Sequence, residues 1–256
     1  MFLNQGLPYA QAAETSCSYA REYITTLEFL RSQKVFSIGD PEARNIAMKV
    51  SRGCSGAAQR FIRVSSTLSK SGLGSRDSLL LGVEFATRKD EEVQTFHTVF
   101  LTTFLEDHLN LDLEAALRIA RSLTTEFKGD TLAVRKDFMK LVHFCTDEKD
   151  LNLPKPQCAN FAARLAQQSE KWEAELAAGF IQIFNFLRSD NGPSLTTAQA
   201  LQLAEILFKG GKEAPSNFTQ AYRYAVSAKG LSLGAKDAVQ FAQSMTVPED
   251  SQAAAK

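Results

Sequence analysis

The sequence predicts an all-α fold, an α-solenoid of about six antiparallel helical hairpins that contains about twelve helices. Three observations lead to it: a ten-residue pattern recurs six times, a helix-type segment with an aromatic residue precedes each copy, and no segment alternates apolar and polar residues as a strand would. The composition is that of an ordinary globular protein, with 44% apolar and 23% charged side chains among 256 residues. A core of useful size can therefore form.

Each copy of the pattern begins with an aliphatic residue, called the anchor below. A serine, alanine or cysteine follows five positions after the anchor, apolar residues stand at six or eight, and alanine or glycine stands at nine. The anchors are Ile38, Leu73, Leu111, Leu153, Leu195 and Leu233, and their separations are 35, 38, 42, 42 and 38 residues. Because a small residue lets two helices approach closely, each pattern is interpreted as the second helix of a hairpin.

An aromatic residue, called the leading aromatic below, lies twelve or fifteen residues before each anchor. The six are Tyr23, Phe61, Phe96, Phe138, Phe180 and Phe218. Apolar residues recur three, four and seven positions from them, which is the periodicity of a helix with one buried stripe. Each leading aromatic is therefore interpreted as part of the first helix of a hairpin.

The predicted helix bounds follow from these patterns. First helices are expected near 15–34, 55–70, 90–108, 131–146, 171–190 and 215–229, and second helices near 40–53, 75–88, 112–127, 156–168, 196–209 and 235–246. Asp40 and Pro41 are expected as a cap with a first-turn proline, and Thr196 or Thr197 as another cap. Since one hairpin cannot bury its apolar face alone, the hairpins are expected to stack into one domain over residues 15–246. Residues 247–256 are expected to form a disordered tail.

The N-terminal residues leave two interpretations open. Ala10, Gln11 and Ala12 form a small-x-small triplet like the end of a secretory signal peptide, although no long apolar stretch precedes it. Residues 1–14 are therefore either a signal-peptide remnant or a disordered N-terminus. No run of apolar residues is long enough to cross a bilayer, so no membrane insertion is expected.

The hairpin pattern predicts how the four cysteines pair. Cys17 opens the first helix of the first hairpin and Cys54 closes its second helix, so antiparallel packing brings them together. Cys145 ends the first helix of the fourth hairpin and Cys158 opens its second. Two disulfides would place the protein in an oxidising compartment, with a bacterial periplasm as the leading case. The alternative is four buried free thiols in a cytosolic protein.

No pattern of catalytic residues is evident, so the sequence predicts a protein that is not an enzyme and has neither cofactor nor metal. Its 29 basic and 29 acidic residues balance, which gives no reason to expect nucleic acid as a partner. Three histidines do not form a metal-binding motif. Glu84 is the best candidate for a general acid, but its position in the pattern predicts that it faces solvent.

The position seven residues after each anchor is expected to face outward and to be mostly polar. It holds Asn45, Leu80, Arg118, Asn160, Gln202 and Gln240. Five of these are amides or a guanidinium, which suit the backbone of a peptide or the hydroxyls of a glycan. The five polar residues are therefore predicted to bind a partner. A second candidate surface is the basic cluster of Lys49, Arg52, Arg60 and Arg63, which could meet an anionic partner.

Three functions remain as hypotheses. The first is an exported, non-catalytic scaffold that binds a protein or peptide on the face formed by the second helices. The second is an enzyme acting on cell-wall glycan, or the helical platform of one. The third is an inhibitor or immunity partner of an exported enzyme. The oligomeric state does not follow from the sequence.

Overall fold

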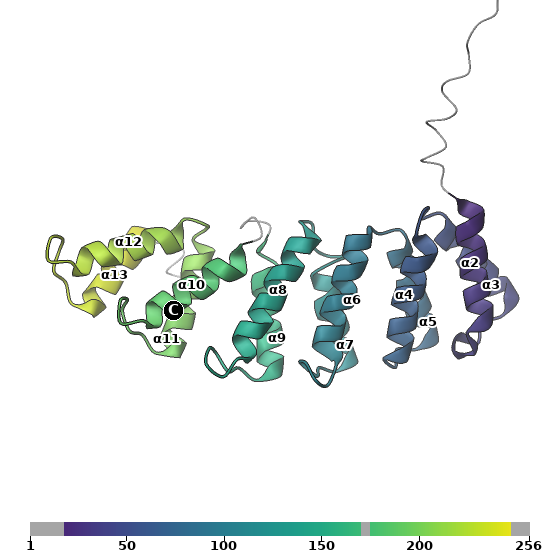
Figure 1. The fold of residues 1–256 in the computed structure, drawn as a ribbon, viewed down its shortest axis with the longest axis horizontal. Coiled ribbons are helices and arrows are strands. Elements are labelled where there is room, and N and C mark those ends of the chain that lie inside the picture. The colour runs from purple at the N-terminus through teal and green to yellow at the C-terminus, as the bar shows by residue number, and fades with distance from the viewer. Residues whose placement is uncertain (1–17, 170–174, 247–256) are drawn as a thin grey trace, which may run out of the picture. The chain divides into compact units, whose positions relative to one another are not determined.

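The computed structural model describes residues 18–169 and 175–246, and within these ranges the protein is all-α (Figure 1). Twelve α-helices and one 3-10 helix are present there, and no strand. The first helices are α2 (Tyr19–Ser32), α4 (Ala57–Lys70), α6 (Asp90–Phe104), α8 (Thr131–Thr146), α10 (Leu176–Arg188) and α12 (Ala214–Val226). The second helices are α3 (Asp40–Ser51), α5 (Ser75–Ala86), α7 (Leu113–Ser122), α9 (Lys155–Ala166), α11 (Thr197–Lys209) and α13 (Ala235–Thr246). The predicted all-α helical-repeat fold is confirmed.

The chain divides into two compact units whose boundary passes through α6 and α7. Unit 1 comprises residues 1–98 and 112–117, and unit 2 comprises residues 99–111 and 118–256. In unit 1, α2 packs on α3 and α4 packs on α5. In unit 2, the packed pairs are α8 with α9, α10 with α11, and α12 with α13. Continuity of these units as one domain over residues 15–246 stays a prediction.

The turn inside each hairpin has the same backbone geometry. The residue just before each anchor is in the left-handed region, with φ between 46° and 92°, at Ser37, Gly72, Asn110, Asn152, Ser194 and Ser232. Five of the six anchors then donate their N–H to the carbonyl of the residue seven positions after the leading aromatic. For example, the Leu153 N–H donates to the Cys145 carbonyl at 2.8 Å, as Leu195 does to Leu187. Glycine, asparagine and serine tolerate this conformation better than branched residues do.

The predicted core positions are buried. Positions five and nine after the anchor are buried in all six copies, and five of the six leading aromatics are fully buried. Gly82 shows why position nine must be small, since a Cβ there would lie 2.9 Å from the ring of Phe61. Positions six and eight are less uniform, because Arg44 is exposed and Ile46 is half-buried. The small residues, more than the large ones, thus define the contact between the two helices of a hairpin.

Several predicted boundaries are corrected by the structure. Helix α7 ends at Ser122 instead of continuing to 127, because the hydroxyls of Thr124 and Thr125 donate to carbonyls of the preceding turn and compete with helix continuation. The N-cap of α3 is Gly39, and Asp40 is its first residue, where it pairs with two arginines. The prediction for Thr196 holds, since it forms a capping box with Gln199.

One of the two predicted disulfides joins described residues. Cys145 and Cys158 are bonded, with their α carbons 5.5 Å apart, and both are buried between α8 and α9. Cys17, the predicted partner of Cys54, lies outside the described residues, as do the N-terminal segment 1–14 and the tail 247–256. None of the described helices is long and apolar enough to cross a membrane.

Candidate binding surface on the second helices

The predicted binding residues are all exposed, and each stands on a second helix. They are Asn45, Arg118, Asn160, Gln202 and Gln240, and Leu80 at the same position of α5 is exposed as well. The reason is geometric: with positions five and nine turned into the hairpin, position seven lies on the opposite side of the helix. Exposure of this stripe was predictable from the pattern of small residues alone.

The structure brings two of these residues into one groove. Gln202 of α11 and Gln240 of α13 line a groove of about 600 Å³ in unit 2. Asn160 and Arg118 do not line it, although α9 is linked to α11 by an ion pair of 2.7 Å between Arg164 and Glu205. Asn45 lines a smaller groove of about 160 Å³ in unit 1, between α3 and α5. The stripe is therefore not one uniform site.

The groove is lined by residues of α11 and α13, and both helices pack on α12. Leu203, Ile206 and Val239 supply apolar surface, and Leu203 is buried. The result is a channel with an apolar floor, of the size usual for a ligand site.

Glutamine side chains dominate the polar lining of this groove. Gln199, Gln202, Gln240 and Gln243 all contribute, and Lys236 is the one charged residue among the residues that line it. The carbonyl oxygen of Gln199 accepts hydrogen bonds from the N–H and hydroxyl of Thr196, at 3.2 and 2.9 Å. Each of the other three amides offers two donors and an acceptor toward the groove or solvent. The surface is thus nearly neutral and suited to hydrogen bonding in both directions.

The groove in unit 1 has a different chemistry. Its lining combines exposed Leu80 and half-buried Ile46 and Val83 with the cations Lys49 and Arg76. Asn45 is the one amide among the residues that line it, and Glu42 the one carboxylate. This small, mixed surface lacks the set of amides that distinguishes the groove of unit 2.

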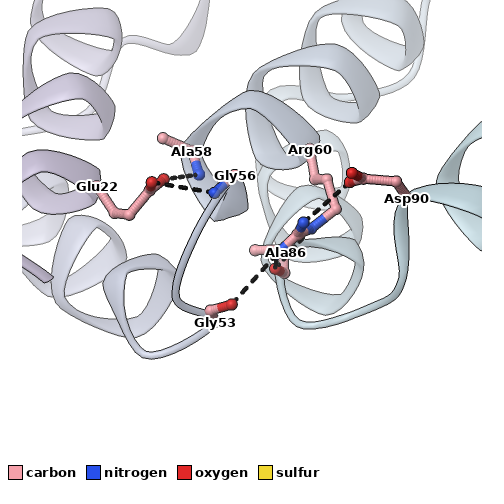
Figure 2. Close-up of polar contacts among 7 residues, drawn as sticks. All are labelled: Glu22, Gly53, Gly56, Ala58, Arg60, Ala86 and Asp90. Atoms are coloured by element: carbon pink, nitrogen blue, oxygen red, sulfur yellow. Dashed lines mark hydrogen bonds and ion pairs between the residues drawn. The ribbon is translucent and has the colours of Figure 1, made fainter. Parts of the chain in front are cut away.

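The predicted basic cluster is corrected by the structure, because Arg60 serves the interior of the fold. Its guanidinium donates to the carbonyl of Ala86 at 3.0 and 3.1 Å and to that of Gly53 at 3.2 Å (Figure 2). It also pairs with Asp90 at 2.9 Å, and its side chain is only 11% exposed. Arginine is favoured here because one planar group reaches several acceptors at once.

The other members of the cluster remain exposed. Lys49, Arg52 and Arg63 are all on the surface of unit 1. Arg63 lies near His97, whose pKa is lowered, first by burial and second by the charge of Arg63. With Arg60 engaged internally, three exposed cations are left of the four that were predicted to meet an anionic partner.

Analysis of the sequence missed a set of polar residues that join neighbouring hairpins. The residue just before the leading aromatic is Glu22 in α2, Arg60 in α4 and Asp137 in α8, and each contacts the next hairpin, at Gly56 and Ala58, at Asp90 and at Ala177, respectively. A charged residue next to a buried aromatic was the available signal. For Arg60, the sequence pattern instead predicted a place in the exposed basic cluster.

The candidate general acid, Glu84, pairs at 3.9 Å with Arg88, two residues beyond the end of α5, and is partly exposed. Among the residues that the structure describes, no group of three His, Cys, Asp or Glu side chains is placed to hold a metal ion. Comparison of the chain with protein-family models, with curated protein sequences and with solved structures found no match.

Proposed function

We propose that the protein is an exported, non-catalytic helical-repeat scaffold that binds a protein or peptide partner on its second helices, in the groove between α11 and α13. The observation that carries this proposal is the lining of that groove: four glutamines over an apolar floor, with Lys236 as the one charge among its lining residues. Two of the four, Gln202 and Gln240, stand at the outward position of the repeat.

An extended polypeptide segment fits this lining better than a charged small molecule does. A main chain in extended conformation presents alternating N–H and C=O groups, and a glutamine amide can pair with either. The apolar surface of Leu203, Ile206 and Val239 offers a place for alternate side chains of the bound segment. A nearly neutral groove gives no preference for a strongly charged ligand.

One observation supports export. The disulfide between Cys145 and Cys158 persists best in an oxidising compartment, of which a bacterial periplasm is the leading case. Loss of the bond in a reducing compartment would remove a link that closes a loop of thirteen residues. Thiol labelling without reductant should find no free sulfhydryl in the denatured chain isolated from its native cells, and full labelling would contradict export.

The binding proposal is tested by capture and then by substitution. The native chain, with its disulfides intact, is used to capture partners from the exported fraction, and mass spectrometry identifies a stoichiometric protein. The Gln202→Ala/Gln240→Ala variant should bind that partner at least about tenfold more weakly, because two buried hydrogen bonds to the segment are lost. Its melting temperature should not change, since both side chains are exposed.

The matched control is the Arg118→Ala/Asn160→Ala variant, which alters the same outward position outside the groove. Equal weakening by both variants would assign the partner to the whole stripe, and unchanged affinity of the first would refute the groove. The amides also suit the hydroxyls of a glycan. Release of glycan fragments by the pure protein would therefore overturn the scaffold in favour of an enzyme acting on cell-wall glycan.

A further inference from the structure

The contacts between neighbouring hairpins follow a rule in the first helices. In the first, third, fourth and fifth hairpins, the residue six positions after the leading aromatic touches the next hairpin. Phe29 lies 6.0 Å from Phe61 between ring centroids, and Phe186 lies 5.8 Å from Tyr222. The ring of Phe144 is 5.2 Å from that of Phe184 in the same way. Thr102 makes the corresponding contact by donating to the sulfur of Met139 at 3.4 Å.

A second rule holds for the second helices. The residue twelve positions after the anchor is at most 3% exposed in the first five hairpins, at Val50, Phe85, Leu123, Leu165 and Leu207. The contact is explicit for Phe85, whose ring lies 4.4 Å from the leading aromatic Phe96 of the next hairpin. Together the two positions define the face by which one hairpin receives the next one.

The sixth hairpin leaves the same two positions exposed. Tyr224 stands six positions after Phe218 and is 55% exposed, and Met245 stands twelve positions after Leu233 and is 66% exposed. Asn217 stands where Glu22 and Asp137 reach across to the next helix, and it too is exposed. We call the surface formed by Tyr224, Met245 and Asn217 the end face.

In the first hairpin, the residues at the positions that would receive a preceding hairpin are exposed or only partly buried. Its leading aromatic, Tyr23, is only partly buried, whereas the other five are at most 1% exposed. The next residue, Ile24, is 53% exposed, whereas its equivalent Met139 is 36% exposed and accepts a hydrogen bond from Thr102 of the preceding hairpin. Tyr19, in the first turn of α2, is 55% exposed. We call the surface formed by Tyr19, Tyr23 and Ile24 the start face.

We propose that the end face of one copy of this chain binds the start face of a second copy, as an intermolecular version of the contact between hairpins. The pairing follows the internal rule, since Tyr224 would meet Tyr23 and Ile24 as Phe29 meets Phe61 and Thr102 meets Met139. The polar contact is matched as well. Helix α2 begins without a side-chain cap, so the amide oxygen of Asn217 can accept from its first N–H groups.

A second copy is the occupant that explains both surfaces at once, because each face has the composition that the other requires. The contact is heterologous, so further copies add in the same direction unless the assembly closes into a ring. This association is independent of the groove between α11 and α13.

The test measures the mass of the full chain, with its disulfides intact, by light scattering and sedimentation over a concentration series. Mass should rise with concentration. Tyr224→Glu and Ile24→Glu should each raise the concentration required by roughly tenfold or more, since each puts an unpaired carboxylate into an apolar contact. Leu80→Glu is the matched control, because Leu80 is 59% exposed but lies on neither face, and it should associate as the native chain does.

The decisive arm mixes the two variants. Tyr224→Glu retains a start face and Ile24→Glu retains an end face, so an equimolar mixture should form a dimer of one copy of each and nothing larger. A chain that is monomeric at every concentration would overturn the proposal. Sensitivity to Tyr224→Glu alone would also overturn it, because it indicates a symmetric contact. Association that appears only after removal of residues 247–256 would assign the end face to that segment instead.

Discussion

The first hairpin contacts the second, and the fourth contacts the fifth, through a carboxylate that accepts from N–H groups at the start of a helix. The residues that make the two contacts differ. In the first, the carboxylate of Glu22 accepts from the N–H groups of Gly56 and Ala58, at 3.1 and 2.7 Å (Figure 2). In the second, the carboxylate of Asp137 accepts from the N–H of Ala177 at 3.0 Å and from the hydroxyl of Ser169 at 2.7 Å. Both carboxylates precede a leading aromatic.

The helices that receive these carboxylates, α4 and α10, have no side-chain cap of their own. Their first N–H groups are instead satisfied by the preceding hairpin, and the negative charge lies at the positive end of the helix dipole. An N-cap is usually a residue next to the helix that it caps. Here the capping carboxylate comes from the preceding hairpin, so it also joins the two hairpins. The difference is burial: Asp137 is fully buried, whereas Glu22 is 8% exposed.

Arg60 occupies the same position in the second hairpin but serves the opposite end of a helix. It donates to the carbonyl of Ala86, the last residue of α5, and pairs with Asp90 in the first turn of α6 (Figure 2). A cation is suited to free carbonyls as an anion is to free N–H groups. In these three hairpins the residue before the leading aromatic therefore satisfies a helix end, while its charge differs between them.

The largest expected effect is that of Asp137→Ala. This substitution leaves the N–H of Ala177 and the hydroxyl of Ser169 without a partner in a fully buried place, so the free energy of unfolding should fall by about 3 kcal/mol. Urea unfolding of the full chain measures this loss of free energy. Amide hydrogen exchange of the folded protein shows where in unit 2 it occurs. Exchange should accelerate most at Ala177 and in the first turn of α10.

Asp130→Ala is the matched control for that experiment. Asp130 is a local N-cap that accepts from Leu132 and Ala133 at the start of α8, and it is exposed. Its loss should cost about 1 kcal/mol. An Asp137→Ala variant that costs no more than this control, or that leaves α10 protected, would contradict the view that the cap joins two hairpins.

Glu22→Ala is expected to have an intermediate effect, of about 1–2 kcal/mol, because its backbone partners can be partly satisfied by water once the carboxylate is gone. Exchange should accelerate at Gly56 and Ala58 and leave α10 unchanged. Glu22→Gln sharpens the comparison, since the amide keeps one acceptor and loses the charge. If Glu22→Gln destabilises as much as Glu22→Ala, the charge at the helix terminus is the dominant contribution.

The sequence was sufficient for the arrangement of helices but not for what joins them. The spacing of small residues such as Ala43 and Gly82 predicted the hairpins and the outward stripe, because a helix imposes a fixed period on whatever it buries. The groove between α11 and α13 was not predictable, since it depends on how the hairpin of α10 and α11 packs against the hairpin of α12 and α13. Arg60 was assigned to the surface because its acceptors, the carbonyls of Gly53 and Ala86, are backbone atoms that no sequence pattern reveals.

The smallest expected effect on stability is that of replacing Asp40, an exposed acid of unit 1. Asp40 pairs with Arg31 and with Arg44, the latter at 2.7 Å, and the hydrogen bond from Arg31 is the first cause that lowers the pKa of Asp40 below its usual value of 3.8. Since this carboxyl is exposed, solvent and salt screen both pairs. At neutral pH, Asp40→Asn should therefore unfold at a slightly lower urea concentration than the native chain.

The pH dependence of that difference is what tests its origin. A lowered pKa in the folded state means that the stabilisation is complete above the usual pKa and is lost as pH falls through the lowered one. The native chain and Asp40→Asn should thus converge in stability at acid pH, below 3.8. Added salt should reduce the difference at neutral pH, whereas it should leave the effect of Asp137→Ala nearly intact. A difference that persists unchanged in acid would show that Asp40 acts through helix α3 itself and not through its arginines.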